Sequence, residues 1–461
     1  MKLPRIPSSR SIWIPILLGL ASLTPMAGFG AEDAPYRLSD HLGLDGGFKL
    51  SGSQRTRYET LTNNVRAASS KNDQLLAFQT ILRADYSTDS VRGQLELMDS
   101  RQALADSGSI IGNTEVNTLD ILQANVQTDF NLADGTIENT VKIGRYTSDL
   151  GARRLMARNR FRNAINAFDG VELSSRWESG MQLRSFYAQP VNRLPADFQS
   201  ILDNEFEADD SSNGTRIVGV HLSVPELANR INGEFFLLDL KEKDTRFRNT
   251  RNRNFYTAGL RLLRPPRRGE LDFDLEAIVQ NGTQRESTAA VDLRSLDHKA
   301  GFGYLSAGYT FDVDANTRLL LEYDQASGDK NPFDGESNRF DSLYGVSVFA
   351  YGPGSLYGVF SRSNISSPGL RLFSDPLPNL NVMASYRRFW LDSSTDSWGR
   401  TGYRDRTGAT DDYVGEHLEL RLRWTVLPGN LMIEIASVFL NANGFSDENS
   451  RYAHIAAVFT Y

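Results

Sequence analysis

The chain has no cysteine and only five histidines among its 461 residues. The lack of cysteine excludes disulfide scaffolds, thiolate metal sites and cysteine nucleophiles. The histidines lie in five separate segments without the spacing of a metal site, and no candidate nucleophile stands on a recognisable turn. We therefore predict no catalytic residue, no metal ligand and no cofactor.

Long apolar runs are also missing beyond the first 30 residues, where none approaches the roughly 18 apolar residues of a membrane-spanning helix. Residues 1–30 resemble a cleavable signal peptide: three basic residues precede the apolar run 12–20, and small residues lead to a cleavage site after about Gly30. An uncleaved anchor helix is the alternative, but Pro15 and Pro25 would interrupt it. Export is expected.

Positive charge is in deficit. The net charge of −7 becomes −10 when residues 1–30 are removed, because they carry three basic and no acidic residues. An acidic chain does not displace the counterions of phosphate backbones, so nucleic acid is not expected as a partner.

Short alternating segments recur along the chain instead. From Leu271 to Gln280 the odd positions are apolar and the even positions are polar, except for Ile278. From Val414 to Val426 the same alternation holds, with Glu416 out of place. A soluble sandwich also alternates, but dense charge of both signs on the second face is typical of a water-filled pore wall. The pattern predicts an all-β fold, with residues 31–461 forming one antiparallel transmembrane β-barrel in the outer membrane.

The C-terminus carries the most specific local signal. Ala453, Ile455, Ala457, Phe459 and Tyr461 alternate up to a terminal aromatic residue. Outer-membrane barrels commonly end in this way. We expect Tyr461 to be read by the barrel-insertion machinery.

The chain length allows between sixteen and twenty strands of about ten residues. Long polar connections, expected outside the cell, alternate with short turns, expected in the periplasm. The long connections are Leu61 to Asp73, Arg101 to Thr118, Ser148 to Ala167, Asn192 to Asn213 and Glu242 to Arg253; short ones include residues 88–90, 178–180 and 265–269. Between Ser327 and Pro378, two short apolar segments add two wall strands or belong to one large loop.

Four short motifs occur in an order that resembles the alginate export family of outer-membrane proteins. They are Phe168-Asp169-Gly170-Val171, Ala326-Ser327-Gly328-Asp329, the run from Arg339 to Gly345, and Ser363-Asn364. The resemblance covers most of the exported chain. It implies eighteen strands, with residues 328–363 as a large extracellular loop. It also implies passage of an acidic polysaccharide of alginate type, with periplasmic secretion proteins as partners.

Six arginines within eighteen residues form the main candidate for the solute pathway. With Asp149 as the single acid among them, they are Arg145, Arg153, Arg154, Arg158, Arg160 and Arg162. Planar guanidinium groups bind carboxylates bidentately, which suits a polymer with one carboxylate per sugar. Alternation alone points Arg145 away from the lumen, so its inclusion requires a bulge near Gly144. Alternatively, the cluster lies outward against lipopolysaccharide phosphates.

Two further groups complete the predicted pore wall. A positive track is expected from Lys49, Arg55, Arg57, Arg83 and Arg184, and an opposing acidic wall from Asp272, Asp274, Glu276, Glu322 and Asp324. Three functions remain open: a channel for an acidic polysaccharide or organic acid, a general diffusion porin, and a structural or adhesive barrel without transport.

Overall fold

The computed structural model describes residues 35–67, 69–132, 135–246, 248–348, 350–443 and 449–461. The expected signal peptide, residues 1–30, lies outside the described residues. Two short helices and twenty strands occur in the described part, and β8 and β15 are only two residues long. In this part of the chain, no helix has the length and apolar character needed to cross a membrane.

The elements have the following bounds. The helices are α1 (Leu38–His41) and α2 (Phe198–Leu202), and the two short strands are β8 (Asp210–Ser211) and β15 (Glu336–Ser337). The first nine wall strands are β1 (Phe48–Thr62), β2 (Asn72–Ser87), β3 (Val91–Ala103), β4 (Asn117–Leu132), β5 (Ile137–Tyr146), β6 (Phe168–Trp177), β7 (Gln182–Asn192), β9 (Thr215–Ala228) and β10 (Ile231–Glu242). The other nine are β11 (Asn254–Arg264), β12 (Leu271–Gln284), β13 (Leu296–Thr310), β14 (Arg318–Ala326), β16 (Ile365–Leu377), β17 (Leu380–Trp390), β18 (Tyr413–Leu427), β19 (Leu431–Ala442) and β20 (Ser450–Thr460).

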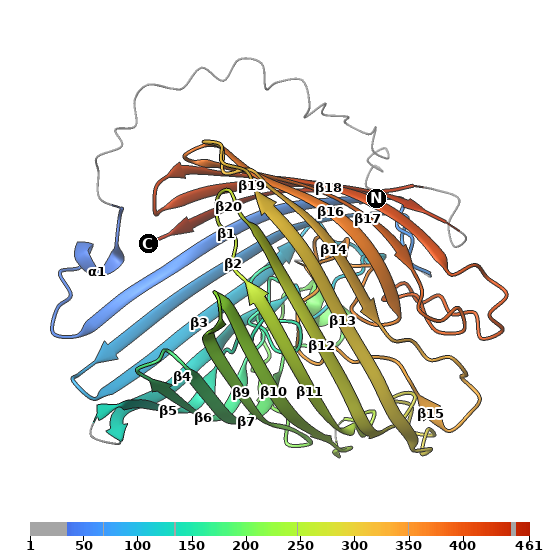
Figure 1. Cartoon of the computed structure of the whole chain (residues 1–461), viewed down its shortest axis with the longest axis horizontal. Coiled ribbons are helices and arrows are strands. Elements are labelled where there is room, and N and C mark those ends of the chain that lie inside the picture. The colour runs from blue at the N-terminus through green and yellow to red at the C-terminus, as the bar shows by residue number, and fades with distance from the viewer. Residues whose placement is uncertain (1–34, 68, 133–134, 247, 349, 444–448) are drawn as a thin grey trace, which may run out of the picture. The chain divides into compact units, whose positions relative to one another are not determined.

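The eighteen long strands form a closed antiparallel barrel. Each pairs with the next around the wall, and β20 returns to pair with β1, as Figure 1 shows. At this seam Ser53 lies opposite Thr460 and Thr62 lies opposite Arg451. The predicted all-β barrel of eighteen strands is confirmed.

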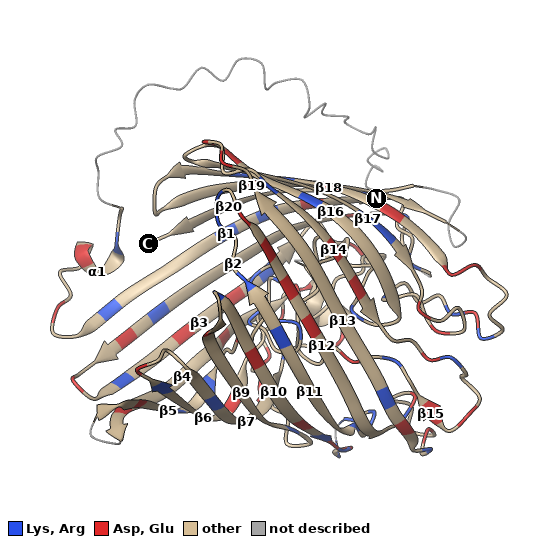
Figure 2. Cartoon of the chain, in the orientation of Figure 1, with Lys and Arg blue, Asp and Glu red and all other residues tan. Residues whose placement is uncertain are grey.

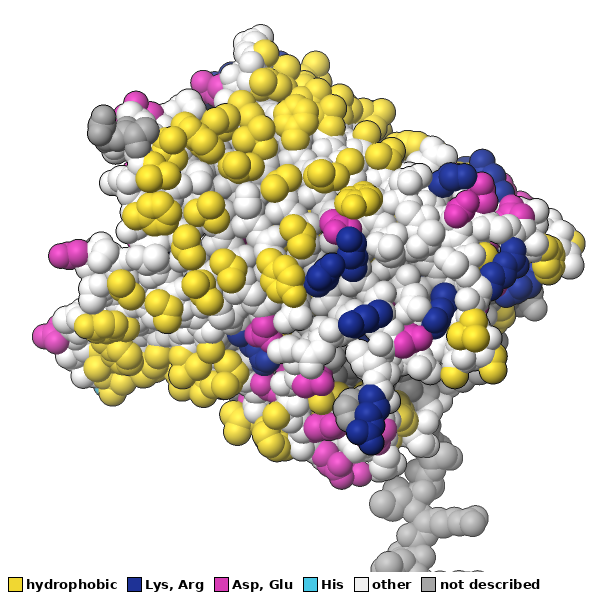
Figure 3. All heavy atoms as spheres, turned by 90° about the horizontal axis from the view of Figure 1, so that it is seen from below, with side chains coloured by type: hydrophobic (Ala, Val, Ile, Leu, Met, Phe, Trp, Pro, Cys, Tyr) yellow, Lys and Arg dark blue, Asp and Glu magenta, His cyan; other side chains and the backbone are white. Residues whose placement is uncertain are grey.

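The outer surface of the wall is apolar where the strands alternate. On β12 the side chains of Leu271 and Val279 are 65% and 63% exposed, whereas Asp272 and Gln280 are buried inside. Figure 3 shows hydrophobic side chains spread over one part of the surface and charged ones gathered over another. Ile278, the apolar residue on the inner face, is buried in a hydrophobic core inside the barrel. Ile278 breaks the alternation because its side chain packs against apolar residues inside the barrel rather than facing water.

Short turns lie at one end of the barrel and long loops at the other. The turns include residues 88–90, 229–230 and 428–430, and the longest loops are residues 147–167, 193–214, 327–364 and 391–412. Outer-membrane barrels keep short turns in the periplasm and long loops outside the cell, which assigns the two ends.

Loops 147–167 and 327–364 fold inward and contact each other. Met156 and Tyr344 form a parallel bridge, and the amide of Val346 donates to the carbonyl oxygen of Arg153 at 3.0 Å. A Cβ atom on Gly345 would lie 1.9 Å from the carbonyl oxygen of Arg154. Only glycine permits this approach, so the two loops are joined through their backbones.

Apolar side chains of these loops build the interior core. Leu155, Phe340, Tyr357 and Phe360 are buried there, and Phe360 stacks on Phe389 of the wall with ring centroids 3.7 Å apart. Burial of each such side chain contributes about 1.5–3 kcal/mol. The loops are consequently part of the folded body of the barrel.

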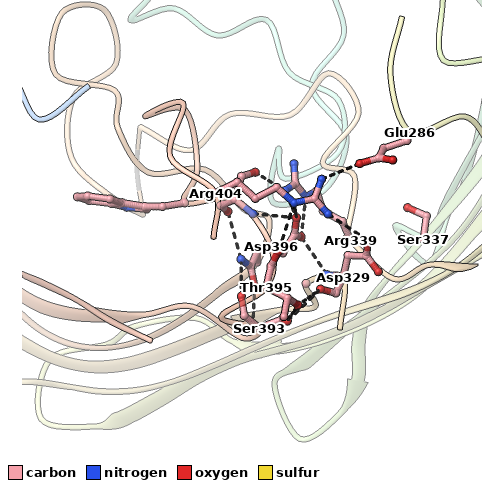
Figure 4. Close-up of polar contacts among 12 residues, drawn as sticks. Glu286, Asp329, Ser337, Arg339, Ser393, Thr395, Asp396 and Arg404 are labelled. Atoms are coloured by element: carbon pink, nitrogen blue, oxygen red, sulfur yellow. Dashed lines mark hydrogen bonds and ion pairs between the residues drawn. The ribbon is translucent and has the colours of Figure 1, made fainter. Parts of the chain in front are cut away.

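A polar cluster fixes loop 327–364 to its neighbours (Figure 4). The buried carboxylate of Asp396 accepts from Nε of Arg339 at 2.7 Å and from the amide of Asp329 at 2.9 Å. Arg404 donates to Glu286 at 2.8 Å, which adds the loop between β12 and β13. Because Asp396 and Arg404 belong to loop 391–412, three extracellular loops are joined.

Candidate pore and its arginine residues

A cavity of about 640 Å³, here named the lumen cavity, lies between the inner wall and the inward loops. Its lining contains eight arginines and three glutamates. The arginines are Arg55, Arg57, Arg83, Arg153, Arg158, Arg160, Arg421 and Arg423, and the glutamates are Glu96, Glu419 and Glu434. The charged lining is therefore strongly biased toward positive groups.

Three of the lining arginines come from loop 147–167, as the sequence pattern predicts. Arg160 is the most open of these: its side chain is 69% exposed, and the nearest carboxylate oxygen, on Asp149, is 3.8 Å away. Arg158 makes two bonds to the carboxylate of Glu96, at 2.6 and 3.0 Å. Arg153 also lines the cavity. Arg160 thus presents its charge to a solute, while much of the charge of Arg158 is compensated.

Two arginines of β1 support the loop from the wall. Arg55 donates to the carbonyl oxygens of Arg160 and Arg162 at 2.6 and 2.7 Å. Arg57 donates to Phe161 at 2.6 Å, pairs with Glu59 and lies 4.3 Å from the centre of the Phe161 ring. These guanidinium groups line the cavity and also hold the loop backbone in place.

Arg421 and Arg423 of β18 belong to the cavity but are absent from the sequence prediction. Arg423 pairs with Glu434 and remains 40% exposed, whereas Arg421 forms no ion pair with any described residue. Their odd positions in the alternating segment were a usable signal. What the sequence lacked was the information that β18 and loop 147–167 face the same space.

Arg154, although central in the sequence cluster, does not line the lumen cavity. It pairs with Glu276 and lies 3.6 Å from Asp274, and its guanidinium group sits 3.9 Å from the Tyr304 ring centre. These contacts bind loop 147–167 to the wall formed by β12 and β13. Arg154 is a positioning residue for the loop.

Arg145 does not face the lumen either, so its inclusion in the pathway was wrong. Pairing of β5 with both neighbours continues through Gly144 without a register shift, so alternation places Arg145 on the outward side with Ile143. There it makes a bond of 2.9 Å to Asp169, its cross-strand partner. The bulge that a lumen position required is absent from this strand, which the structure describes fully.

The remaining predicted basic residues are dispersed. Arg162 lines a separate cavity among the loops, and Arg184 pairs with Glu172 at 2.6 Å while donating to the carbonyl oxygen of Asp149. Lys49 lies near the periplasmic end of β1 and is exposed. Arg83 lines the lumen cavity and is paired with Asp85 at 2.6 Å.

The predicted opposing acidic wall is compensated by arginines, and none of its carboxylates lines the lumen cavity. Acidic bands along β12 lie beside basic ones of neighbouring strands in Figure 2. The ion pairs are Asp272 with Arg318, Asp274 with Arg261, Glu276 with Arg154, Glu322 with Arg371, and Asp324 with Arg387. The expectation of two opposed charged walls was therefore wrong, because these acids neutralise arginines of the wall and of loop 147–167.

A closed barrel with an apolar outer surface, charged inner residues and inward-folded extracellular loops is the architecture of an outer-membrane channel. Within the described ranges, no group of three His, Asp or Glu side chains is placed to hold a metal ion. The chain belongs to the alginate export family, whose sequence profile matches residues 48–459.

Solved structures of Pseudomonas outer-membrane proteins share the fold. OpdK of Pseudomonas aeruginosa is 15% identical with a TM-score of 0.58, covering 90% of this chain and 98% of its own. A BenF-like porin of Pseudomonas fluorescens is 13% identical with a TM-score of 0.58, and the match covers 90% of this chain and 98% of the porin. OpdF of Pseudomonas aeruginosa, solved in complex with glucuronate, is 16% identical with a TM-score of 0.54. The match covers 89% of this chain and 97% of OpdF. No curated protein matches the sequence.

Proposed function

We propose that this protein is an anion-preferring channel for carboxylate-bearing sugars, with an acidic polysaccharide of alginate type as the first candidate substrate. The observation that carries the proposal is the lining of the lumen cavity, in which eight arginines face three glutamates. Guanidinium groups in a confined, partly desolvated passage attract carboxylates and bind them in two-point geometry. Membership of the alginate export family supports the same class of solute.

The groups that would act on a passing solute are those not consumed by the protein itself. Arg160 and Arg421 meet this description. Arg160 is 69% exposed and makes only a long contact of 3.8 Å with Asp149. Arg421 forms no ion pair with any described residue. Arg55 and Arg57 contribute positive electrostatic potential to the cavity, but their guanidinium groups already donate hydrogen bonds to the backbone of loop 147–167.

A porin for small acids is the second candidate. Loops 147–167 and 327–364 narrow the barrel, which favours a small solute over a chain of many sugars. Similarity of fold to a BenF-like porin and to a protein solved with glucuronate adds weight to this candidate.

The test is the reversal potential of single channels in a planar bilayer under a salt gradient, followed by addition of glucuronate or of a hexameric polyuronate. Anion preference is expected in the wild type and should fall in the Arg160→Gln, Arg421→Gln double variant. Each single variant, Arg160→Gln and Arg421→Gln, is compared with Arg267→Gln, which removes one positive charge in the periplasmic turn between β11 and β12 and is therefore a matched control.

The outcomes separate the candidates. Block by the hexamer supports the polysaccharide, and block by glucuronate alone supports the porin for small acids. Conductance without ion preference or block leaves a general diffusion porin, and no conductance leaves a structural or adhesive barrel. Either of the last two results overturns the proposal.

A further inference from the structure

Three extracellular loops bring arginines to a second cavity, here named the loop cavity, of about 300 Å³. Arg66 comes from the loop between β1 and β2, Arg162 from loop 147–167 and Arg400 from loop 391–412. Glu115 is the single acidic residue of the lining. Glycine and serine residues make up much of the remaining wall, so the space is left open beside the guanidinium groups.

None of these arginines forms an ion pair with a described residue, although the wall arginines nearby mostly do. Arg66 donates to the carbonyl oxygens of Leu356 and Tyr357, both at 2.8 Å, and Arg162 makes one long bond of 3.4 Å to Asn166. The side chain of Arg400 makes no hydrogen bond with any residue that the structure describes. The backbone amide of Arg400 donates a hydrogen bond of 3.1 Å to the carbonyl oxygen of Val359, which fixes the position of the residue on the loop.

Glu115 acts on all three arginines through its charge, but a single carboxylate compensates at most one of their three positive charges. Its buried carboxylate accepts from the amide of Gly112 at 3.0 Å and from the hydroxyl of Thr114 at 2.7 Å, both on its own loop. Burial raises the pKa of Glu115, which favours the neutral acid. Burial and the neighbouring Arg193 and Arg400 lower the pKa of Arg162 to about 9. A cluster of like charges in this state is stabilised by an external anion.

The loop cavity lies between two other spaces. It shares Arg66, Ile110 and Arg400 with an outer cavity of about 650 Å³, and it shares Val348 and Pro353 with the lumen cavity. The three arginines of the loop cavity therefore lie in a space that adjoins both the outer cavity and the lumen cavity.

We propose that Arg66, Arg162 and Arg400 form a binding site for a compact dianion, a dicarboxylate or a phosphate group, on the extracellular side of the pore. Two negative charges match an excess of two to three positive ones, and the volume admits a small molecule rather than a polymer segment. The site adjoins the lumen cavity, so the channel holds anions at two positions. This inference rests on the proposed anion-channel function for its role in transport.

The experiment is isothermal titration calorimetry of the full-length refolded barrel with succinate and, separately, with inorganic phosphate at pH 7.5. Arg400→Gln is the main variant, because the side chain of Arg400 makes no hydrogen bond or ion pair with any residue that the structure describes. Loss of one charge-assisted donor pair should weaken binding by about tenfold or more. Arg400→Lys keeps the positive charge but lacks the planar guanidinium group, so its affinity for the dianion should lie between those of the wild type and Arg400→Gln.

Arg406→Gln is the matched control, since Arg406 lies on the same loop and pairs with Glu286 outside the cavity. Saturable binding of either dianion that weakens in Arg400→Gln and persists in Arg406→Gln supports the site. The dianion that binds more tightly shows whether the site prefers a dicarboxylate or a phosphate group. Absence of binding, or equal loss in both variants, overturns it. The reversal potential of the same proteins keeps the two proposals apart, because lumen selectivity that survives in Arg400→Gln leaves the proposed function standing whatever the calorimetry shows.

Discussion

Individual arginines in this barrel divide into those that hold the structure and those that face a solute, and the division does not follow their order in the sequence. Arg154 and Arg160 are six positions apart on one loop, yet Arg154 is paired with Glu276 and Asp274 whereas Arg160 is 69% exposed. Neutralising Arg154 should therefore lower the stability of the barrel, whereas neutralising Arg160 should lower its preference for anions.

For Arg154→Gln we expect a loss of stability of about 3–5 kcal/mol, because the change leaves the buried carboxylate of Glu276 without its counter-charge. Unfolding of the refolded barrel in urea, followed by tryptophan fluorescence, measures this. The double variant Arg154→Gln, Glu276→Gln should recover a large part of the loss. Arg160→Gln is the control, and a destabilisation of equal size there would contradict the assignment.

Asp209 supplies a pH-dependent contribution at the residue scale. Burial and the nearby Asp120 raise the pKa of Asp209, in the loop between β7 and β9, to about 6. An acid whose folded pKa is raised binds its proton more tightly in the folded state, so its stabilising effect is present below about pH 4 and is lost as pH rises to about 6. Asp209→Asn keeps the acceptor for the amide of Leu194 and removes the charge.

Hydrogen exchange of loop 193–214 should therefore speed up between pH 4 and 6 in the wild type, after correction for intrinsic exchange, and stay level in Asp209→Asn. The difference at pH 7 is expected to reach up to about 3 kcal/mol. Asp203→Asn, an exposed acid of the same loop, should behave as the wild type. Identical profiles for all three proteins would refute this account.

At the scale of elements, the inward loops determine how much of the barrel interior remains open. Gly345 makes the close backbone contact between loops 147–167 and 327–364, and any side chain there would collide with the carbonyl oxygen of Arg154. We expect Gly345→Val to separate the loops and to raise single-channel conductance and current noise. Gly303→Val, at an outward position with nothing within 4 Å of its Cβ, is the control. Unchanged conductance in Gly345→Val would show that these loops do not limit the passage.

At the scale of the whole molecule, the barrel is closed by the seam between β20 and β1. Tyr461 extends it through two backbone bonds to Gly52, at 2.9 and 3.0 Å. Ten residue pairs of the seam remain without Tyr461, from Ser53 with Thr460 to Thr62 with Arg451. Deletion of Tyr461 should therefore leave spontaneous refolding into lipid vesicles intact.

Insertion in cells is a separate matter, because we expect the terminal aromatic residue to be read by the barrel-insertion machinery. The deletion variant should reach the outer membrane at a several-fold lower level than the wild type, as measured by heat-modifiable mobility of membrane fractions. Tyr461→Phe, which keeps the aromatic ring, should insert normally. Equal insertion of all three would remove Tyr461 as a signal.

The sequence alone determined the wall of this protein. Alternation with a period of two places every second side chain on the same face, so segments such as Leu271 to Gln280 predict both the strands and their lipid side without knowledge of their neighbours. Connection lengths likewise predicted which end carries the loops. These are local properties, and local physics suffices for them.

Only the tertiary structure decided which charges are free. Whether an arginine faces a solute depends on carboxylates far away in the sequence, as with Arg154 and Glu276, which are 122 positions apart. It also depends on loops from distant parts of the chain that line one cavity, as with Arg66, Arg162 and Arg400. Electrostatic compensation acts through space at distances of a few ångströms, and a linear pattern of residue types does not contain those distances.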